Sequence, residues 1–177
     1  MVRFLLPLGV AAILSGCAGV DPAGLRAAAA LSPLDADPAA LSLRVEATPG
    51  YGLHPESARL RLAVSAPAGP GVDVVVTLHQ RAAGSGGIRL GVAPRDLPRL
   101  AAAQARGRAL KALHGRAAVG TLSLSAAPCR TAQATGAGFA TVWLRTAPDA
   151  PGVPLLRDVP IAALAPGGTV AALPACG

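Results

Sequence analysis

Alternation of apolar and polar residues along short segments constrains the fold of this chain more than any other feature. In 41–46 and 59–64, Leu or Val recurs at every second position, and 72–79 continues the pattern with Val and Leu. Successive side chains of a β-strand point to opposite faces of a sheet, so this period of two predicts strands with one buried and one polar face. Further short strands are predicted at 88–92, 121–125, 139–146 and 159–164.

A helix is expected to interrupt these strands. Residues 97–113 are rich in Ala, Leu, Gln and Arg, which favour helix. Asp96 is placed to cap the N-terminus, Pro98 lies in the first turn, and His114-Gly115 is typical of a helix end. Gly107 divides the segment, and the apolar residues before and after it fall on different faces. The helix is therefore predicted either to bend at Gly107 or to end near it.

Short strands separated by Gly- and Pro-containing turns predict a mainly β fold: an antiparallel β-sandwich of about six to seven strands with one inserted helix. The alternative is an α+β domain in which the helix packs on one sheet face. Alanine inflates the hydrophobic fraction of 52%, and aromatic residues make up only 2%, so the core must be built mainly from Leu, Val and Ala. A single domain is predicted at 41–177, after a Pro- and Ala-containing tether at 17–40.

The first residues have the parts of a signal peptide: Arg3, an apolar run at 4–14, and small residues before Cys17. The run is shorter than the roughly 20 apolar residues of a membrane-spanning helix. The tetrad Leu14-Ser15-Gly16-Cys17 resembles the lipobox of bacterial lipoproteins. The alternative interpretation is an ordinary secretory signal in which the cysteine falls by chance.

The lipobox resemblance implies that a signal peptide, residues 1–16, is removed and that acyl chains such as palmitate are attached to Cys17. By similarity to the family, Ala18 implies sorting to the outer membrane of a Gram-negative bacterium, facing the periplasm. The rest of the chain looks similar to uncharacterised small lipoproteins of high-GC Gram-negative bacteria, on the segments 100–110, 129–131, 143–146 and 154–159. That second likeness implies no activity.

Two cysteines remain after Cys17, namely Cys129 and Cys176. The periplasm is oxidising, so a lone pair of cysteines there is expected to form a disulfide. The rival interpretation is a nucleophilic Cys129 with a histidine partner, but no sequence signature supports it.

No pattern for enzyme chemistry stands out. The glycine-flanked Ser85 lacks the Gly-x-Ser-x-Gly spacing of a nucleophile elbow. His54, His79 and His114 are too widely separated in the sequence to form a local zinc-binding pair. The acidic residues suggest no catalytic pair, since Glu46 and Asp73 are expected on outward strand faces opposite arginines. Phosphate-loop and dinucleotide patterns are absent. We therefore expect no catalytic residues, no metal and no cofactor.

The clearest indication of a binding surface is a basic segment at 95–116, in a chain of formal net charge +7. A solvated helix face is one interpretation, and contact with anionic lipids or an acidic partner is the other. Nucleic acid is disfavoured, because the compartment is wrong and no aromatic residues are interleaved for base stacking. The candidate anion- or partner-binding residues are Arg99, Arg106, Arg108 and Lys111, within a run that also holds Arg95, Arg116 and the single acid Asp96.

Trp143 also has two interpretations. Alternation along 139–146 places Trp143 on the face opposite Val142 and Leu144. That face is either the outer surface, where Trp143 would anchor an interface, or the core, if the register is reversed.

These features lead us to expect a non-enzymatic, lipid-anchored periplasmic lipoprotein that acts as an envelope adaptor or structural module. Its membrane contact would be made through the acyl chains on Cys17, and its partner would be an envelope protein or anionic lipid. The alternative is a binding module for a small anionic or lipidic ligand held between the sheets. An envelope enzyme would require a pocket with convergent polar groups such as Glu46, His54 or His79.

Overall fold

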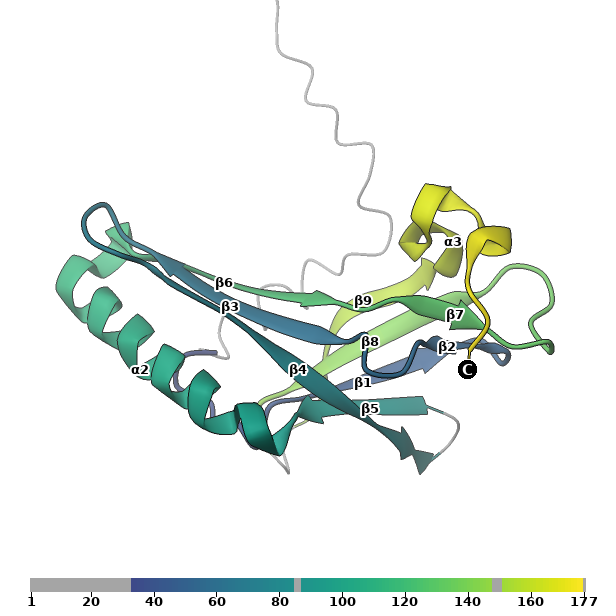
Figure 1. The fold of residues 1–177 in the computed structure, drawn as a ribbon, viewed down its shortest axis with the longest axis horizontal. Helices are drawn as coiled ribbons and strands as arrows, with labels where there is room; N and C mark the ends of the chain where they lie inside the picture. The colour runs from purple at the N-terminus through teal and green to yellow at the C-terminus, as the bar shows by residue number, and fades with distance from the viewer. Residues whose placement is uncertain (1–32, 85–86, 148–150, 177) are drawn as a thin grey trace, which may run out of the picture.

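The computed structural model describes residues 33–84, 87–147 and 151–176 (Figure 1). The predicted signal peptide, Cys17 and most of the predicted tether lie outside these residues. Within the described chain, a large antiparallel sheet is combined with one long helix, α2 (Leu97–His114).

The large sheet has seven strands, in the order β6-β3-β4-β5-β1-β8-β9, and every neighbouring pair is antiparallel. The prediction of a mainly β, antiparallel fold of six to seven strands with an inserted helix is confirmed. The strands form one curled sheet, with β2 and β7 paired beside it. The bounds in the large sheet are β1 Ser42–Ala47, β3 Arg59–Ser65, β4 Val72–Ala83, β5 Gly87–Val92, β6 Val119–Ser125, β8 Phe139–Arg145 and β9 Val153–Pro160.

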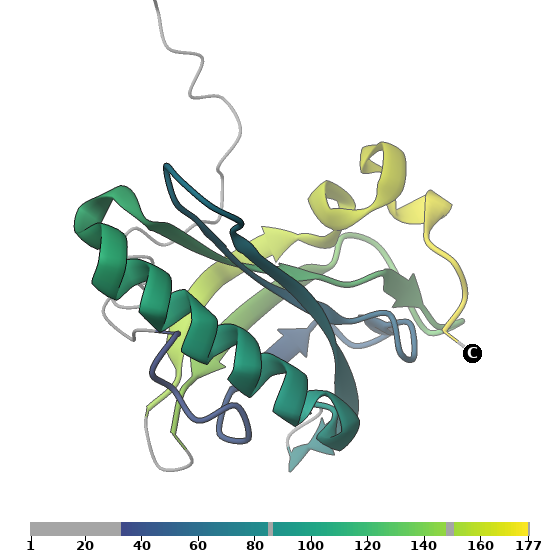
Figure 2. The same ribbon diagram turned by 60° about the vertical axis from the view of Figure 1, so that its left-hand side comes forward.

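Strand β4 makes the sheet curl, because its two halves pair with different neighbours. Its first half, from Val72 to Thr77, pairs with β3, and its second half, from Leu78 to Ala83, pairs with β5. The sheet therefore wraps around its inner face, as Figures 1 and 2 show from two directions. Short 3-10 turns flank α2 at Pro94–Asp96 and Gly115–Ala117.

Asp96 has a role that differs from the predicted helix cap. It occupies the N-cap position of α2, but its side chain makes no capping hydrogen bond. Instead, its Oδ2 accepts a hydrogen bond of 2.8 Å from the backbone N–H of Thr77, where β4 passes from one partner to the next. The capping prediction is wrong because this strand amide, once it has left the sheet ladder, competes for the same carboxylate.

The core lies between the inner face of the sheet and α2. On β1, β3 and β8 the buried residues alternate with less buried ones, as predicted, and α2 contributes Leu100, Ala103, Gln104 and Gly107 to the buried side. The spacing of these four residues keeps them on one helix face. The core is aliphatic, and its most deeply buried large side chains include Leu78, Leu90, Leu100, Val64 and Val76.

Gly107 neither ends nor divides the helix. The helix continues through it to His114, and the residue that caps it is Gly115, with a φ of 56°. A Cβ added at Gly107 would lie 2.9 Å from Leu34 Cδ2 and 3.0 Å from Val64 Cγ2. The glycine therefore allows the helix to approach the sheet closely. Leu100 is buried on that side, whereas Leu113, near the end of the helix, is exposed.

Residues 33–40 pack on the domain. Leu34 is only 6% exposed and belongs to the core. The Gln104 side-chain amide donates hydrogen bonds to the carbonyls of Pro33 at 2.8 Å and Ala36 at 2.9 Å. The guanidinium of Arg108 donates to the carbonyl of Leu34. The packed part of the chain thus extends at least to residue 33, ahead of the predicted domain start at residue 41.

A second, smaller core includes residues of α3, which lies at the other end of the sheet from α2 (Figure 1). It holds Ile161 and Leu173, and partly buried Tyr51 packs against it. Here β2 (Tyr51–Leu53) pairs with β7 (Pro128–Arg130), followed later by α3 (Ile161–Leu164) and 3-10 turns at Pro166–Gly168 and Val170–Ala172. The predicted strand at 159–164 is wrong beyond Pro160. The chain turns there because Ile161 points into the small core and its N–H bonds to the carbonyl of Gly138.

The predicted disulfide between Cys129 and Cys176 is present. It joins β7 to the end of the chain, and backbone hydrogen bonds of 2.9 Å run on both sides of it, from Arg130 to Pro174 and from Cys176 to Arg130. The final residues thereby extend the small β2–β7 sheet, and the disulfide packs over Gly52.

Candidate functional site

The four predicted binding residues of α2 are not equivalent in the structure. Arg99 makes a loose ion pair with Asp96 at 3.8 Å, and Arg108 is tied to the Leu34 carbonyl. Arg106 and Lys111 are exposed and make no hydrogen bond or ion pair within the described residues. Only these two are therefore fully available to an outside partner.

A second basic surface lies on the outer face of the large sheet, and it was not predicted from the sequence. The strand register places Arg81 of β4 directly opposite Arg89 of β5, and Arg89 directly opposite Arg44 of β1. Arg44 in turn lies opposite Trp143 of β8. We call Arg81, Arg89 and Arg44 the arginine row. Neighbouring strands are about 4.8 Å apart, so the row brings three positive charges into a line roughly 10 Å long.

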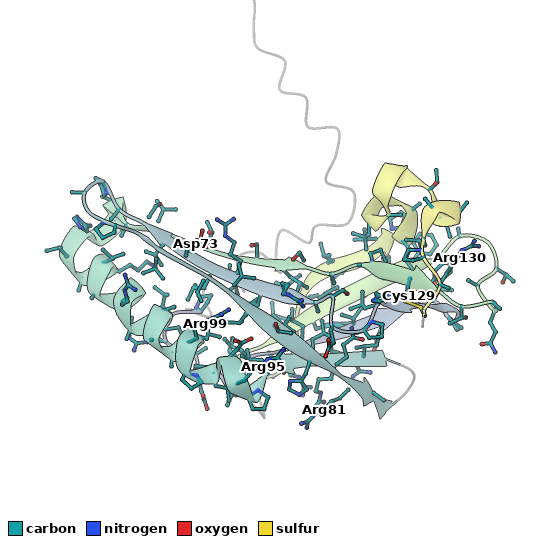
Figure 3. The ribbon with its side chains drawn as sticks, viewed as in Figure 1. Asp73, Arg81, Arg95, Arg99, Cys129 and Arg130 are labelled. Atoms are coloured by element: carbon teal, nitrogen blue, oxygen red, sulfur yellow. A yellow bond between two sulfur atoms is a disulfide. The ribbon has the colours of Figure 1, made fainter. Side chains whose placement is uncertain are left out.

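Like charges placed directly opposite each other on neighbouring strands destabilise a sheet. Arg44 is compensated by an ion pair with Glu46, and its guanidinium carbon lies 6.0 Å from the centre of the Trp143 ring. Arg81 and Arg89 are exposed and make no ion pair within the part of the chain that the structure describes. Figure 3 shows Arg81 projecting away from the ribbon near the end of β4. The row therefore presents cationic groups to solvent at a cost in folding energy.

The structure decides between the two interpretations of Trp143. Its neighbours Val142 and Leu144 are buried on the inner face, so Trp143 lies on the outer face, half-buried. Gly152 covers part of it, since a Cβ added there would lie 3.2 Å from Trp143 Cβ. On the same outer side of β8 lie Phe139, which is 46% exposed, and half-buried Arg145.

The described residues form two surface hollows of note. One, of about 400 Å³, lies where the β3–β4 hairpin meets β6 and includes Arg61 and Asp73. The other, of about 600 Å³, lies beside the start of α2 and includes Glu56, His79 and Arg95. Glu46 and His54, named above as possible enzyme groups, line neither of these two hollows.

A metal site would require several His, Cys, Asp or Glu side chains close together. His79 Nδ1 is buried without a hydrogen-bond partner in the described structure, and the His79 ring packs against Gly91. Among the described residues, no three His, Cys, Asp or Glu side chains are grouped so that they could hold a metal ion.

Arg61 and Asp73 form a two-pronged ion pair on the outer face, with Nε–Oδ1 at 2.8 Å and Nη2–Oδ2 at 2.6 Å. The hydrogen bond from Arg61, followed by its charge, lowers the pKa of Asp73 below the ordinary value. The prediction of an outward Asp73 beside an arginine is thus correct. The predicted outward position of Glu46, which pairs with Arg44, is correct as well.

The lowered pKa of Asp73 predicts an acid dependence. The ion pair stabilises the fold at pH values above the unfolded pKa of roughly 3.9, and this contribution is lost as the pH falls through the lower folded pKa. Both groups are exposed, so the effect on stability is small. An NMR titration of the Asp73 carboxyl carbon should give a pKa below the ordinary value in the native chain, and Arg61→Gln should return it upward. An unchanged pKa in the variant would contradict this assignment.

The fold and these surfaces define a mainly β domain with a curled antiparallel sheet, one long helix and one disulfide among the described residues. Comparison with known proteins finds no match to a family model, a curated protein or a solved structure. The likeness to bacterial lipoproteins therefore stays a prediction from the residues that carry it. No helix in the described ranges is both long enough and apolar enough to cross a membrane.

Proposed function

We propose that this chain is a lipid-anchored lipoprotein of the bacterial envelope, facing the periplasm from the outer membrane, and that it acts as an adaptor or structural module. The Leu14-Ser15-Gly16-Cys17 tetrad is the observation that carries the anchor. The Cys129–Cys176 disulfide supports the compartment, because such bonds persist in oxidising environments and are rare in reducing ones. Cys17 is thereby left for the lipid, and the other two cysteines are used by the fold.

The contact with another envelope component is made through the exposed side of α2. Arg106 and Lys111 carry this part of the proposal, because both are exposed and neither is used by a hydrogen bond or ion pair within the described residues. Arg108, by contrast, helps to hold residues 33–40 on the domain. An acidic surface on a partner protein would form ion pairs with Arg106 and Lys111.

The packing of the interior favours an adaptor over a module that holds a ligand inside the sheet. At Gly107 one added carbon would come closer to Leu34 than non-bonded carbon atoms pack, and almost as close to Val64. The two hollows described above open at the surface, one at the β3–β4 hairpin and one beside α2.

The test is affinity purification from detergent-solubilised envelopes, with the wild-type chain compared with Arg106→Ala/Lys111→Ala. The double variant should lose the co-purifying partner by about tenfold, since exposed charge pairs contribute up to ~1 kcal/mol each and about 1.4 kcal/mol corresponds to tenfold. Alanine favours helix, so α2 itself should be undisturbed. Retention of every partner by the double variant would refute the proposed contact.

Cys17→Ser tests the anchor in the same preparation. The variant should move from the membrane to the soluble fraction, and mass spectrometry of the wild-type chain should show acyl chains on Cys17. A wild-type chain without lipid at Cys17 would refute the anchor, whatever the result for α2.

A further inference from the structure

We infer that the outer face of β4, β5, β1 and β8 is a second docking surface, and that it binds the anionic phospholipid headgroups of a membrane. The surface consists of the arginine row together with Arg145, Trp143 and Phe139. It goes beyond the adaptor contact proposed above, because it lies on the sheet and not on α2. It also assigns a binding partner of different chemistry.

The first observation is the concentration of uncompensated charge. Three arginines stand directly opposite one another across β4, β5 and β1, and Arg145 follows on β8 opposite Ser42. Glu46 is paired with one of these arginines, Arg44, while Arg81 and Arg89 have no acidic partner within the described residues. Arranging like charges in this way opposes folding. Phosphate groups that accept two hydrogen bonds from each guanidinium would relieve that repulsion.

The second observation is the position of the aromatic side chains, which favours a lipid membrane as the binding partner of this surface. Beyond the predicted cleavage site the chain has only Tyr51, Phe139 and Trp143 as aromatic residues. Two of these three lie on the outer side of β8, although a core built from small aliphatic residues would gain from burying them. Trp and Phe beside Arg are the combination that proteins use at the boundary between headgroups and acyl chains.

The geometry places these groups on one continuous strip. Arg89, Arg44 and Trp143 occupy directly paired positions on three adjacent strands, and Phe139 and Arg145 share the outer side of β8 with Trp143. The ring of Trp143 lies beside the Arg44 guanidinium, at 6.0 Å. Helix α2 packs on the opposite, inner face of the sheet, so the strip is not covered by the helix.

The experiment uses the mature chain with Cys17→Ser, so that no acyl chain contributes to binding. Vesicles of equal parts phosphatidylglycerol and phosphatidylcholine are compared with vesicles of phosphatidylcholine alone. Trp143 is the single tryptophan of the chain and therefore reports on this surface directly. We expect co-sedimentation with the anionic vesicles only, release by salt, and quenching of Trp143 fluorescence by brominated phosphatidylcholine included in those vesicles.

The variant Arg81→Gln/Arg89→Gln should lower the vesicle partition coefficient by about 25-fold, or roughly fivefold for each arginine. Arg106→Gln/Lys111→Gln on α2 is the matched control, because it removes the same amount of charge from a different surface, and it should change binding far less. The melting temperature of Arg81→Gln/Arg89→Gln should be equal to or higher than that of the wild-type chain, because the like charges have been removed.

Several outcomes would overturn the inference. One is an equal loss of binding in the two double variants, which would mean that only net charge matters. Another is sedimentation without quenching of Trp143, a result that does not depend on any variant folding. Binding to soluble polyphosphate but not to vesicles would indicate a different anion. None of these outcomes bears on the α2 contact or the anchor, which are tested by co-purification and by lipid mass.

Discussion

Replacing Cys129 and Cys176 together by alanine is expected to lower the free energy of unfolding by about 4 kcal/mol. The bond closes a loop across a sequence separation of 47 residues, and in the chain-entropy treatment a cross-link of that span restricts the unfolded chain by about this amount. In the folded chain it holds the last residues beside β7 and packs over Gly52, so the small sheet also loses its third segment. The measurement is urea denaturation of the double variant and of the wild-type chain, monitored by circular dichroism.

Two comparisons make this prediction specific. Reducing agent should destabilise the wild-type chain by a similar amount and leave the double variant unchanged. Cys17→Ser, which removes the third cysteine, should leave the free energy of unfolding as it is. A loss below ~1 kcal/mol on removing the bond would contradict the prediction, because it would mean that the unfolded chain gains little freedom.

Truncating Leu100 to alanine is expected to cost about 3 kcal/mol of unfolding free energy. Leu100 is 1% exposed and joins α2 to the main core, so the substitution removes buried methyl groups and leaves a cavity. The neighbours cannot easily fill that cavity. Gly107, two turns further along the same helix face, already brings Leu34 and Val64 into close contact with the helix backbone.

The same helix offers a matched control for Leu100. Leu113→Ala is the identical substitution at a side chain that is 76% exposed, and it should change the free energy of unfolding by less than about 0.5 kcal/mol. Urea denaturation of both variants measures the difference. Similar losses in the two variants would show that helix propensity, and not burial of one face of α2, governs the stability of this region.

Much of the fold could be predicted from local patterns. The alternation at 41–46, 59–64 and 72–79 predicts β1, β3 and β4, and 97–113 predicts α2 to within one residue of its observed end. The disulfide was predicted because only Cys129 and Cys176 remain after Cys17 is assigned to the lipid. These inferences succeed because the period of the side chains and the number of thiols are properties of the chain itself.

The errors share one physical cause. Asp96 was expected to cap its own helix, but it bonds to Thr77, a residue on another element. Residues 161–164 have a pattern compatible with a strand, but Ile161 is held in a small core made with Leu173 and Ala140. In each case a local preference of less than about 1–2 kcal/mol was outweighed by a contact that forms only when distant segments meet.

The two candidate surfaces also differ in how far the sequence alone could predict them. The basic run on α2 is visible in the sequence, whereas the structure separates Arg106 and Lys111 from Arg108, which serves the fold. The arginine row was not predicted. Arg44 and Arg89 lie in predicted strands, but Arg81 lies just beyond the predicted strand at 72–79. Only the register of three strands brings the three arginines into line.

By itself, the sequence determined most strands of the large sheet, where the long helix runs, which cysteines are paired and where a lipid is expected. The tertiary structure alone decided that β4 curls the sheet, that Gly107 is a contact point and not a break, and that an arginine row lies beside Trp143. The reason is that strand pairing depends on backbone groups far apart in the chain, and a shift of register by one residue would turn every side chain of a strand to the other face.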